Sequence, residues 1–563
     1  MAAAFASVVA LSFILGTWGN RWGAPAVWYV DEVTKRAVLM VDHRTVNPHH
    51  FTYGALQRLL VAGGVVIPVR LYARLFDPKP QGDRKAMLAW RTRQDTRIVR
   101  GARTVTAFFF AVLVASTGLV GLLLFDRVTA LLTALLLAIT PQLVVLAHFA
   151  TVDLTATAWY WLACLAALLY WQRGHAGWFY GACFLGGLAL GTKADRLLVL
   201  VPLVVSYWLR RQRRAGVLLT GLVLMFPLAY VVANPALVTS TFEYLDGVSR
   251  EILFNAVRGE GRVSYGLILE YARQGLGTPL FALSIIACCV AVVLALRAGR
   301  RQMLVWILAT FIPYYLLMGR LMVMEWYVAF FYPPVFLLAA YGLVEGFRRL
   351  PRRAAFAAAT PVALVIASTA VRTVRVPTVF ENDAREAASA WIAANVPAGS
   401  TIELVGAVPA LPPDQYRTFV ARDVASCSFY QQTLDQLTEA RSYRKLRAMI
   451  GAAEQWTAGL KGTRVPAAPR EAWFDRFAQA CARPWFSLPP GTDSVWLHPD
   501  FVLIVGDAVA KTLGPSGPSP PEYMLAARFD VPRWSDAVRP TGLVAMPVRI
   551  YQRSDTGVRD RGR

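Results

Sequence analysis

The sequence predicts a mainly α-helical protein: a polytopic transmembrane helix bundle of about eleven spans plus in-plane helices, followed by a C-terminal extracytoplasmic α/β or α+β domain. Apolar residues make up 56% of the 563 residues, against roughly 45–50% in soluble domains. The mean hydropathy is +0.43 even though the last third of the chain is polar. Long apolar runs alternate with short arginine clusters. These observations exclude a soluble globular enzyme, a disordered chain and a coiled coil.

The predicted spans are apolar runs, since a membrane span needs about 20 mostly apolar residues. They lie near residues 2–20, 104–124, 128–148, 154–171, 177–192, 196–209, 216–233, 278–296, 302–318, 326–345 and 354–371. The first run lacks a basic segment before it and is long, which favours an uncleaved anchor over a removed signal peptide.

Arginine clusters set the orientation. Three of them, at 210–214, 297–301 and 348–353, are separated by two spans each and therefore share one side. The positive-inside rule makes that side cytoplasmic, and it accounts for the net charge of +23 without nucleic acid as a partner. Counting spans from these clusters places 79–103 and everything after about 372 on the outer side. We therefore expect an integral protein of a bacterial-type inner (plasma) membrane.

Residues 54–75 allow two interpretations. They could form a further span, or an amphipathic helix in the outer membrane interface with Arg58, Arg70 and Arg74 reaching the headgroups. The second interpretation keeps the basic segment 79–103 outside.

The chain changes character near residue 372. A helical pattern follows, with Trp391 and Ile392 on its apolar face, and buried strands are predicted at 402–405 and 501–505. The predicted division is therefore a membrane module at 1–371 and a soluble extracytoplasmic domain at 372–563.

The first outer loop carries two adjacent acids, Asp31 and Glu32, directly after a span. Acids at such a place are costly unless they are solvated or used. Neighbouring residues point in different directions, so one acid could face a reaction centre while the other orients it or binds a cation. A solvated membrane boundary is the alternative. His49 and His50 lie in the same loop and could be structural or catalytic.

Further charged residues lie at later outer turns. Asp153 starts a span and could be a first-turn acid or face a cavity. Lys193 and Arg320 could form ordinary loop ion pairs or hold a phosphate. The span count puts all these groups on one face of the membrane. That combination suits a reaction with an anionic, lipid-linked substrate at the outer surface.

Four stretches have a familiar order and spacing. They are Val30-Asp31-Glu32 with Asn47 to Tyr53, His148 to Asp153, Gly187 to Lys193, and Trp326-Tyr327 through Pro333-Pro334 to Gly342-Leu343. Across roughly residues 1–345 the chain resembles the GT-C superfamily of polytopic membrane glycosyltransferases, in particular protein O-mannosyltransferases and the lipid A aminoarabinose transferase.

The resemblance implies a sugar donor on a polyprenyl phosphate, and transfer to a lipid, glycan or protein acceptor with inversion at the anomeric carbon. It matches Asp31 and Glu32 to the family's first-loop acids, with Asp31 as the base, and Asp153 to the second acid. It also implies an in-plane helix after the first loop, at 54–75. Two departures bear on selectivity: Ala-Asp-Arg follows Lys193, and the phrase Phe51-Thr52-Tyr53-Gly54 lacks the usual proline.

Elementary chemistry agrees with this reaction. Phosphate is a good leaving group, so one general base suffices, and such a base contributes on the order of 10²–10⁴-fold. The charge on the departing phosphate needs cations, for which the candidates are Lys193, Arg320, His49 and His50. No cofactor is required, although a divalent metal shared by Asp31, Glu32 and Asp153 could take part.

Two other classes of function compete with the enzyme. A polytopic transporter or flippase of a lipid-linked or anionic substrate would explain the spans and the membrane acids, but it predicts inverted repeats, which the sequence does not show. A membrane scaffold that presents the C-terminal domain would leave the first-loop acids without a purpose.

Overall fold

The computed structural model describes residues 1–25, 27, 29, 31–49, 51, 53–210, 214–245, 247, 248, 263–321, 323–405, 411, 415–422, 500–505, 523–530 and 547–554. The chain divides into two compact units. Among the described residues, the first unit contains Met1–Arg21 and Asp31–Thr378, and the second contains the segment that starts at Trp22 and the chain from Val379 onward. The second unit therefore begins within seven residues of the predicted boundary, but it also includes a short N-terminal segment.

The first unit is helical. Ten helical elements lie among its described residues from the N-terminus to Thr192. These are α1 (Ala2–Thr17), α2 (Thr34–Asp42), α3 (Leu56–Val61), the π-helical segment η1 (Ala62–Val66), α4 (Ile67–Phe76), α5 (Arg84–Leu124), α6 (Arg127–Ala138), α7 (Pro141–Ala147), α8 (Val152–Arg173) and α9 (Ala176–Thr192).

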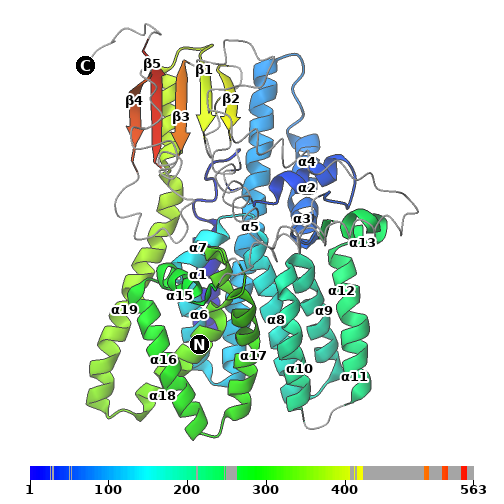
Figure 1. Cartoon of the computed structure of the whole chain (residues 1–563), viewed down its shortest axis with the longest axis vertical. Coiled ribbons are helices and arrows are strands. Elements are labelled where there is room, and N and C mark those ends of the chain that lie inside the picture. Colours follow the sequence, from blue (N-terminus) through cyan, green and yellow to red (C-terminus); the bar gives the residue numbers. More distant parts are fainter. Residues whose placement is uncertain are drawn as a thin grey trace. The chain divides into compact units, whose positions relative to one another are not determined.

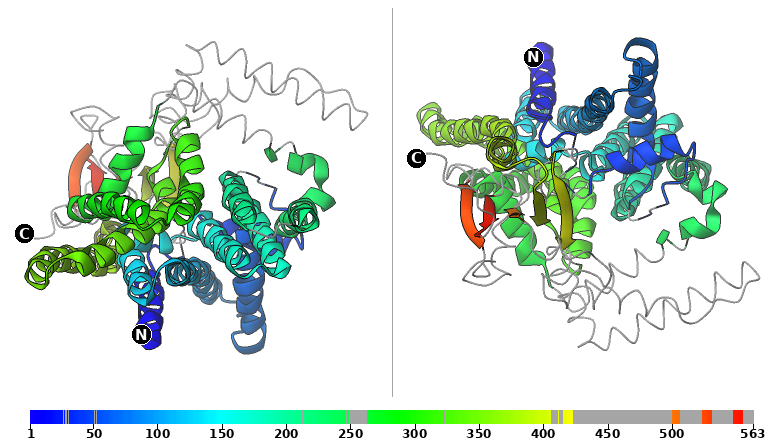
Figure 2. Two further views of the ribbon diagram at one scale, coloured as in Figure 1. Left: turned by 90° about the horizontal axis from the view of Figure 1, so that it is seen from below. Right: turned by 90° about the horizontal axis from the view of Figure 1, so that it is seen from above.

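The remaining helices of the described residues follow, and the last of these lies in the second unit. These are η2 (Ala194–Val199), α10 (Leu200–Leu209), α11 (Ala215–Leu219), η3 (Thr220–Met225), α12 (Phe226–Ala233), α13 (Ala236–Thr239), α15 (Tyr265–Leu276), α16 (Thr278–Arg297), α17 (Arg301–Met318), η4 (Glu325–Phe330), α18 (Tyr332–Arg349), α19 (Arg352–Glu381) and α20 (Ala384–Asn395). The long helices run side by side in a bundle, with α8 between α5 and α9 (Figures 1 and 2).

Local sequence signals explain several helix ends. Asp126 accepts hydrogen bonds from the backbone N–H groups of Val128 and Thr129 at 2.9 Å, which caps the start of α6. Gly174 ends α8 in the left-handed region at φ 77°, where a side chain would be strained. Residues directly beside the apolar runs, such as Asp126 and Gly174, therefore determine where these helices begin and end.

All eleven predicted runs fall on helices, but not all of these helices are long enough alone to cross a membrane. Seven helices of the described residues meet the length and hydropathy of a span, or eight if the bent pair α6–α7 counts as one. The shortfall lies in short elements such as α1 and α9, which have 16 and 17 residues, and in α18, whose last turns carry Glu345, Arg348 and Arg349. The mainly α-helical membrane fold is thus confirmed, with fewer unbroken long helices than predicted.

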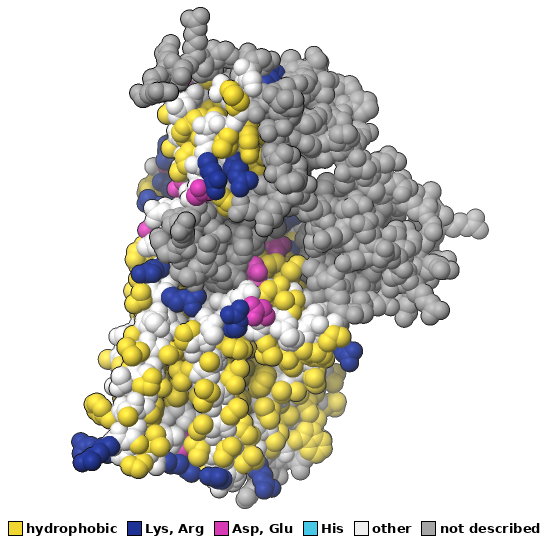
Figure 3. All heavy atoms as spheres, turned by 60° about the vertical axis from the view of Figure 1, so that its left-hand side comes forward, with side chains coloured by type: hydrophobic (Ala, Val, Ile, Leu, Met, Phe, Trp, Pro, Cys, Tyr) yellow, Lys and Arg dark blue, Asp and Glu magenta, His cyan; other side chains and the backbone are white. Residues whose placement is uncertain are grey.

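The outer surface of the bundle agrees with a membrane protein. Large hydrophobic side chains are exposed on α16 and α19, among them Ile286 at 63% and Phe356 at 80%. Figure 3 shows such side chains over this face of the bundle, with lysine and arginine side chains along its lower rim. This pattern is expected where an apolar belt contacts lipid and cations reach the headgroups.

Residues 54–76 form α3, η1 and α4 next to the ends of the bundle helices. Leu56 packs in one apolar cluster with Leu188, near the end of α9, and with Ala229 and Ala233, at the end of α12. Figure 1 shows α2, α3 and α4 beyond the ends of α8, α9 and α12. Leu56–Phe76 has the length and hydropathy of a span, yet its placement favours the in-plane interpretation. Arg58 is 2% exposed, so the expectation that it reaches the headgroups is wrong.

The second unit contains a mixed five-stranded sheet in the order β2-β1-β3-β5-β4. The strands are β1 (Thr401–Val405), β2 (Arg417–Arg422), β3 (Phe501–Val505), β4 (Tyr523–Phe529) and β5 (Val548–Arg553). Strand β1 is parallel to β2 and β3, whereas β5 is antiparallel to β3 and β4. The two predicted strands are therefore confirmed as β1 and β3.

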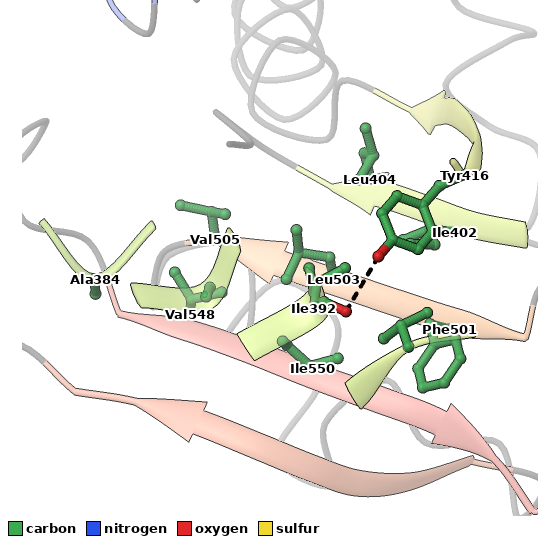
Figure 4. Close-up of a cluster of buried hydrophobic side chains, with 12 residues drawn as sticks. Ala384, Ile392, Ile402, Leu404, Tyr416, Phe501, Leu503, Val505, Val548 and Ile550 are labelled. Atoms are coloured by element: carbon green, nitrogen blue, oxygen red, sulfur yellow. Dashed lines mark hydrogen bonds between the residues drawn. The ribbon is translucent and has the colours of Figure 1, made fainter. Parts of the chain in front are cut away.

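Helix α20 covers one face of this sheet. Ile392 is 1% exposed and packs in a cluster with Ile402, Leu503 and Ile550. The Tyr416 hydroxyl donates to the carbonyl oxygen of Ile392 at 3.3 Å (Figure 4). The helix-and-sheet core confirms the predicted α-and-β character of the C-terminal part.

Candidate functional site

Backbone hydrogen bonds join the loops that carry the predicted site residues. The N–H of Val33 donates to the carbonyl oxygen of Ala150 at 2.9 Å, which joins the first loop to the loop before α8. The N–H of Gly54 donates to the carbonyl oxygen of Thr192 at 3.2 Å, which joins the end of the first loop to the end of α9. The segments that carry Asp31, Glu32, Asp153 and Lys193 are thus neighbours. This agrees with the span count, which put these residues on one face of the membrane.

The two first-loop acids have different surroundings. The Glu32 side chain is fully buried, and the Arg103 guanidinium donates to it through Nε at 3.1 Å and Nη2 at 2.8 Å. Burial raises the pKa of Glu32, and the positive charge of Arg103 opposes that rise. Arg103 also donates to the carbonyl oxygen of Asn20 at 3.2 Å. Asp31, the preceding residue, is half-buried.

Asp153 and Lys193 form a buried ion pair. Lys193 Nζ lies 2.6 Å from Asp153 Oδ1 and 4.0 Å from the ring centroid of Tyr327. Both side chains are 7% exposed. Burial lowers the pKa of Lys193, but Asp153 and Asp195 outweigh it, so the net shift is upward and the lysine stays charged. The first turn of α8 and the end of α9 are therefore held together by opposite charges.

The tripeptide after Lys193 extends this pair into a buried charge cluster. Asp195 Oδ2 lies 3.8 Å from Lys193 Nζ and 3.2 Å from Arg196 Nη1, and it accepts a hydrogen bond from the Tyr314 hydroxyl at 3.0 Å. The Arg196 guanidinium lies 4.6 Å from the ring centroid of Phe330. Asp195 and Arg196, the residues that depart from the family pattern, thus connect the end of α9 to α17 and η4.

His49 contacts a segment far away in the sequence. Its Nδ1 lies 2.7 Å from Glu243 Oε1, and Asn47 Nδ2 donates to Glu243 Oε2 at 2.6 Å. The backbone of His49 is in the left-handed region at φ 50°. His50 lies outside the described residues.

Arg320 is exposed at the turn after α17, and within the described ranges its guanidinium has no hydrogen-bond or ion-pair partner. Among the described candidate cations, Arg320 is therefore the least engaged by protein groups. Those same ranges hold no group of three or more His, Cys, Asp and Glu side chains arranged to bind a metal.

Sequence reasoning missed several partners of the predicted residues. Arg103 and Glu243 lie 71 and 194 residues from the side chains they bind, and nothing local marks them. Asp195 and Arg196 had a signal, since they interrupt the pattern after Lys193. His148 is buried with its ring nitrogens 2.7 and 2.6 Å from the carbonyl oxygens of Val144 and Trp18, which is a structural environment.

Comparison with known proteins adds a family and a set of similar folds. Residues 83–238 match the model of the family described as dolichyl-phosphate-mannose-protein mannosyltransferase. That range includes Asp153, Lys193 and Arg103 but not the first loop. No curated protein matches the chain.

Solved structures similar to this chain include two of ArnT from Cupriavidus metallidurans. The apo state has a TM-score of 0.46 and 15% identity, and the complex with undecaprenyl phosphate has 0.44 and 14%; each comparison covers 98% of this chain and 97% of that chain. The apo oligosaccharyltransferase of Archaeoglobus fulgidus has a TM-score of 0.44 and 15% identity over 70% of this chain. The match spans 58% of the archaeal enzyme's length.

The family match falls on the part of the bundle that carries the Asp153–Lys193 pair. It includes two of the four stretches on which the resemblance was based. The predicted resemblance is confirmed: this integral membrane protein is similar to the GT-C superfamily of polytopic membrane glycosyltransferases.

Proposed function

We propose that the protein transfers a sugar from a polyprenyl-phosphate donor to an acceptor at the extracytoplasmic face, with Asp31 as the general base. The observation that carries the proposal is the convergence of the first loop with the segments that hold Asp153 and Lys193. The matched family is described by a dolichyl-phosphate-mannose donor, which supports a lipid-linked phosphosugar. The acceptor is a lipid, a glycan or a protein.

The proposed reaction is a single displacement. An acceptor hydroxyl oxygen attacks the anomeric carbon while Asp31 takes the hydroxyl proton, and the bond from that carbon to the phosphate oxygen breaks. The electron pair leaves with the polyprenyl phosphate, and the configuration at the anomeric carbon inverts. Asp31 is the candidate base because it is half-buried, whereas the Glu32 side chain is fully buried against Arg103. A base must reach the proton it removes within hydrogen-bond distance.

The remaining acids have supporting roles in this proposal. Glu32 holds the first loop to α5 through Arg103, so it positions Asp31 rather than reacting. Asp153 keeps Lys193 charged at the end of α9. Because Lys193 Nζ has three hydrogens, it could still donate one of them to a donor phosphate.

The departing phosphate needs cations on the same side. Arg320 is exposed and offers a forked set of donors that matches phosphate geometry. Lys193, His49 and His50 complete the proposed donor-phosphate group. No resident metal is required in this scheme, because Arg and Lys supply positive charge. A shared ion among Asp31, Glu32 and Asp153 would have to displace Arg103 and Lys193 from two of the three carboxylates.

The proposal places the site and the C-terminal unit outside the cytoplasm, in a bacterial-type inner membrane. The three basic clusters on the opposite side support this orientation.

Turnover tests the proposed function. Purified protein in lipid vesicles is incubated with a panel of radiolabelled polyprenyl-phosphate sugars and a cell-envelope extract. We expect label to move from the donor to an envelope component, with release of polyprenyl phosphate. A transporter or flippase would instead move intact donor across the vesicle membrane with no covalent product, and that result would refute the proposal.

A further inference from the structure

Lys193 lies beside two carboxylates rather than one. Its Nζ is 2.6 Å from Asp153 Oδ1 and 3.8 Å from Asp195 Oδ2. The side chains of Lys193 and Asp153 are 7% exposed and that of Asp195 is 11% exposed. Two buried negative charges beside one positive charge leave an excess of one negative charge around Nζ. That excess would repel a phosphate, because charges interact more strongly away from water. With Asp153 and Asp195 alone beside it, Lys193 would be a poor phosphate ligand.

Arg196 supplies the missing positive charge. Its Nη1 lies 3.2 Å from Asp195 Oδ2, and its side chain is 2% exposed. The buried charge cluster consists of Asp153, Lys193, Asp195 and Arg196, all within the helical first unit. Its two positive and two negative charges cancel. Lys193 is therefore surrounded by a neutral cluster instead of a negative one.

Aromatic and hydroxyl groups hold Arg196 and Asp195 in place. The Arg196 guanidinium lies 4.6 Å from the ring centroid of Phe330 and 5.1 Å from that of Tyr314. Its Nη2 donates to Thr157 Oγ1 at 3.1 Å, and the Tyr314 hydroxyl donates to Asp195 Oδ2 at 3.0 Å. Charges held in this way need no reorganisation when an anion arrives. Asp195 and Arg196 therefore act on Lys193 as fixed charges.

We propose that Asp195 and Arg196 are positioning residues that set the net charge around Lys193, and with it the affinity for the phosphate of a lipid-linked donor. This inference rests on the proposed function, and it gives a role to two residues that depart from the family pattern. Neither residue touches a reacting atom in this proposal. A merely structural pair would instead support folding alone, through its contacts to α17 and η4.

The size of the expected effect follows from distances. A phosphate oxygen that accepts from Lys193 Nζ lies about 3 Å from that nitrogen, and Asp195 Oδ2 lies 3.8 Å from it. The two negative groups are therefore at most about 7 Å apart. At an effective dielectric constant of about 20, one unit charge at that distance changes binding by about tenfold to 10²-fold. The charge of Arg196 lies farther away, beyond Asp195, and its effect is about tenfold.

Three variants of the full-length protein test the inference. Asp195→Asn removes the negative charge but keeps the size of the side chain and an oxygen for the Tyr314 hydroxyl. Arg196→Gln removes the positive charge, and the double variant removes both. Arg348→Gln, which takes the same charge from an ion pair with Asp126, is the matched control. For each protein, native mass spectrometry measures binding of undecaprenyl phosphate, and donor KM, kcat and the unfolding temperature are also measured.

The inference predicts opposite signs for the two single variants. Asp195→Asn binds undecaprenyl phosphate about tenfold to 10²-fold more tightly than wild type, Arg196→Gln binds it about tenfold more weakly, and the double variant lies between them. Donor KM follows the same order, and Arg348→Gln binds like wild type. Undecaprenol, which lacks the phosphate, binds all five proteins alike. Equal or weaker binding by Asp195→Asn would overturn the inference, whether or not Arg196→Gln folds. Failure of both single variants to fold would identify a structural pair and overturn it as well.

Binding and turnover together separate this inference from the proposed function. If wild type transfers sugar but Asp195→Asn leaves the affinity for undecaprenyl phosphate unchanged, only the inference is wrong. If the variants shift that affinity as predicted while wild type transfers no sugar from any donor, the proposed function has failed and the buried charge cluster still controls phosphate binding.

Discussion

Adjacent residues in the first loop have separate tasks. Glu32 is sealed against Arg103, so its charge contributes to holding the loop. Asp31 is half-buried and lies one residue away. Because consecutive side chains point in different directions, the same short segment can anchor itself and present a carboxylate.

Glu32→Gln should destabilise the protein strongly, because it leaves the buried Arg103 guanidinium without its counter-charge. Breaking one partner of a buried pair typically costs about 3–5 kcal/mol. The matched control is Asp42→Asn, whose partner Arg70 is exposed, and exposed pairs contribute about 0–1 kcal/mol. Reversible unfolding in mixed micelles measures both. Equal stabilities of the two variants would show that the Glu32–Arg103 pair does not hold the loop.

Metal removal is predicted to leave the reaction intact. Two of the three acids that could share an ion are already paired with Arg103 and Lys193. Exhaustive treatment with EDTA should therefore change the transfer rate by less than about twofold, since positive charge at the phosphate comes from side chains. Loss of activity that Mg²⁺ or Mn²⁺ restores would mean that a cation belongs to the site.

Among the elements, the contact between α3, α9 and α12 places the Lys193 end of α9. Small residues make the contact close: a Cβ on Gly187 would lie 2.3 Å from the carbonyl oxygen of Phe226, and one on Gly191 would lie 2.3 Å from the Cβ of Ala233. A Cβ on Gly54 would lie 1.7 Å from the carbonyl oxygen of Gly191. The glycines of the motif before Lys193 therefore serve packing.

Gly54→Ala should push the start of α3 away from α9 and cost about 1–3 kcal/mol, as overpacking does. Gly63→Ala, in the following segment η1, is the control, because nothing lies within 4 Å of its added Cβ. There alanine should be neutral or stabilising by up to about 1 kcal/mol. Thermal unfolding and transfer rate are compared for the pair. A Gly54→Ala protein as stable and active as the control would refute the close contact.

For the whole molecule, the proposed topology can be read by labelling single cysteines. In a chain whose own cysteines are replaced, Lys85→Cys before the long apolar part of α5 and Met524→Cys in β4 should react with an impermeant maleimide in intact spheroplasts. Arg301→Cys, in a basic cluster at the start of α17, should react only after permeabilisation. Labelling of Lys85→Cys solely from inside would place residues 79–103 in the cytoplasm and contradict the in-plane interpretation of residues 54–75.

Periodicity and composition predict the parts of the fold that depend on local sequence. The predicted apolar runs are helices in the structure, and the helical pattern near Ile392 is α20. The two predicted buried strands of the C-terminal part are β1 and β3. Strands β2, β4 and β5 were not predicted, although in β5 Val548 and Ile550 alternate with less buried neighbours. Their pairing partners are distant, and single alternating strands give weak signals.

The sequence predicted which loops of the candidate site lie close together, but not which of their side chains pair. Span parity placed Asp153 and Lys193 on one face, but it could not show that they pair with each other. Nor could span parity show that Glu32 is the buried acid of the two, because its partner Arg103 lies 71 residues further along the chain. The assignment of Trp22 to the second unit depends on Asp383, 361 residues away. Contacts of that separation leave no periodic mark in a single sequence.

The most direct test of the central claim compares wild type with Asp31→Asn in the same vesicle assay, with Asp42→Asn as a control for the loss of one acid nearby. We predict that Asp31→Asn lowers kcat by about 10²–10⁴-fold, as expected for loss of a general base, while its unfolding temperature and donor binding match wild type. Transfer by Asp31→Asn at a near wild-type rate would contradict Asp31 as the base.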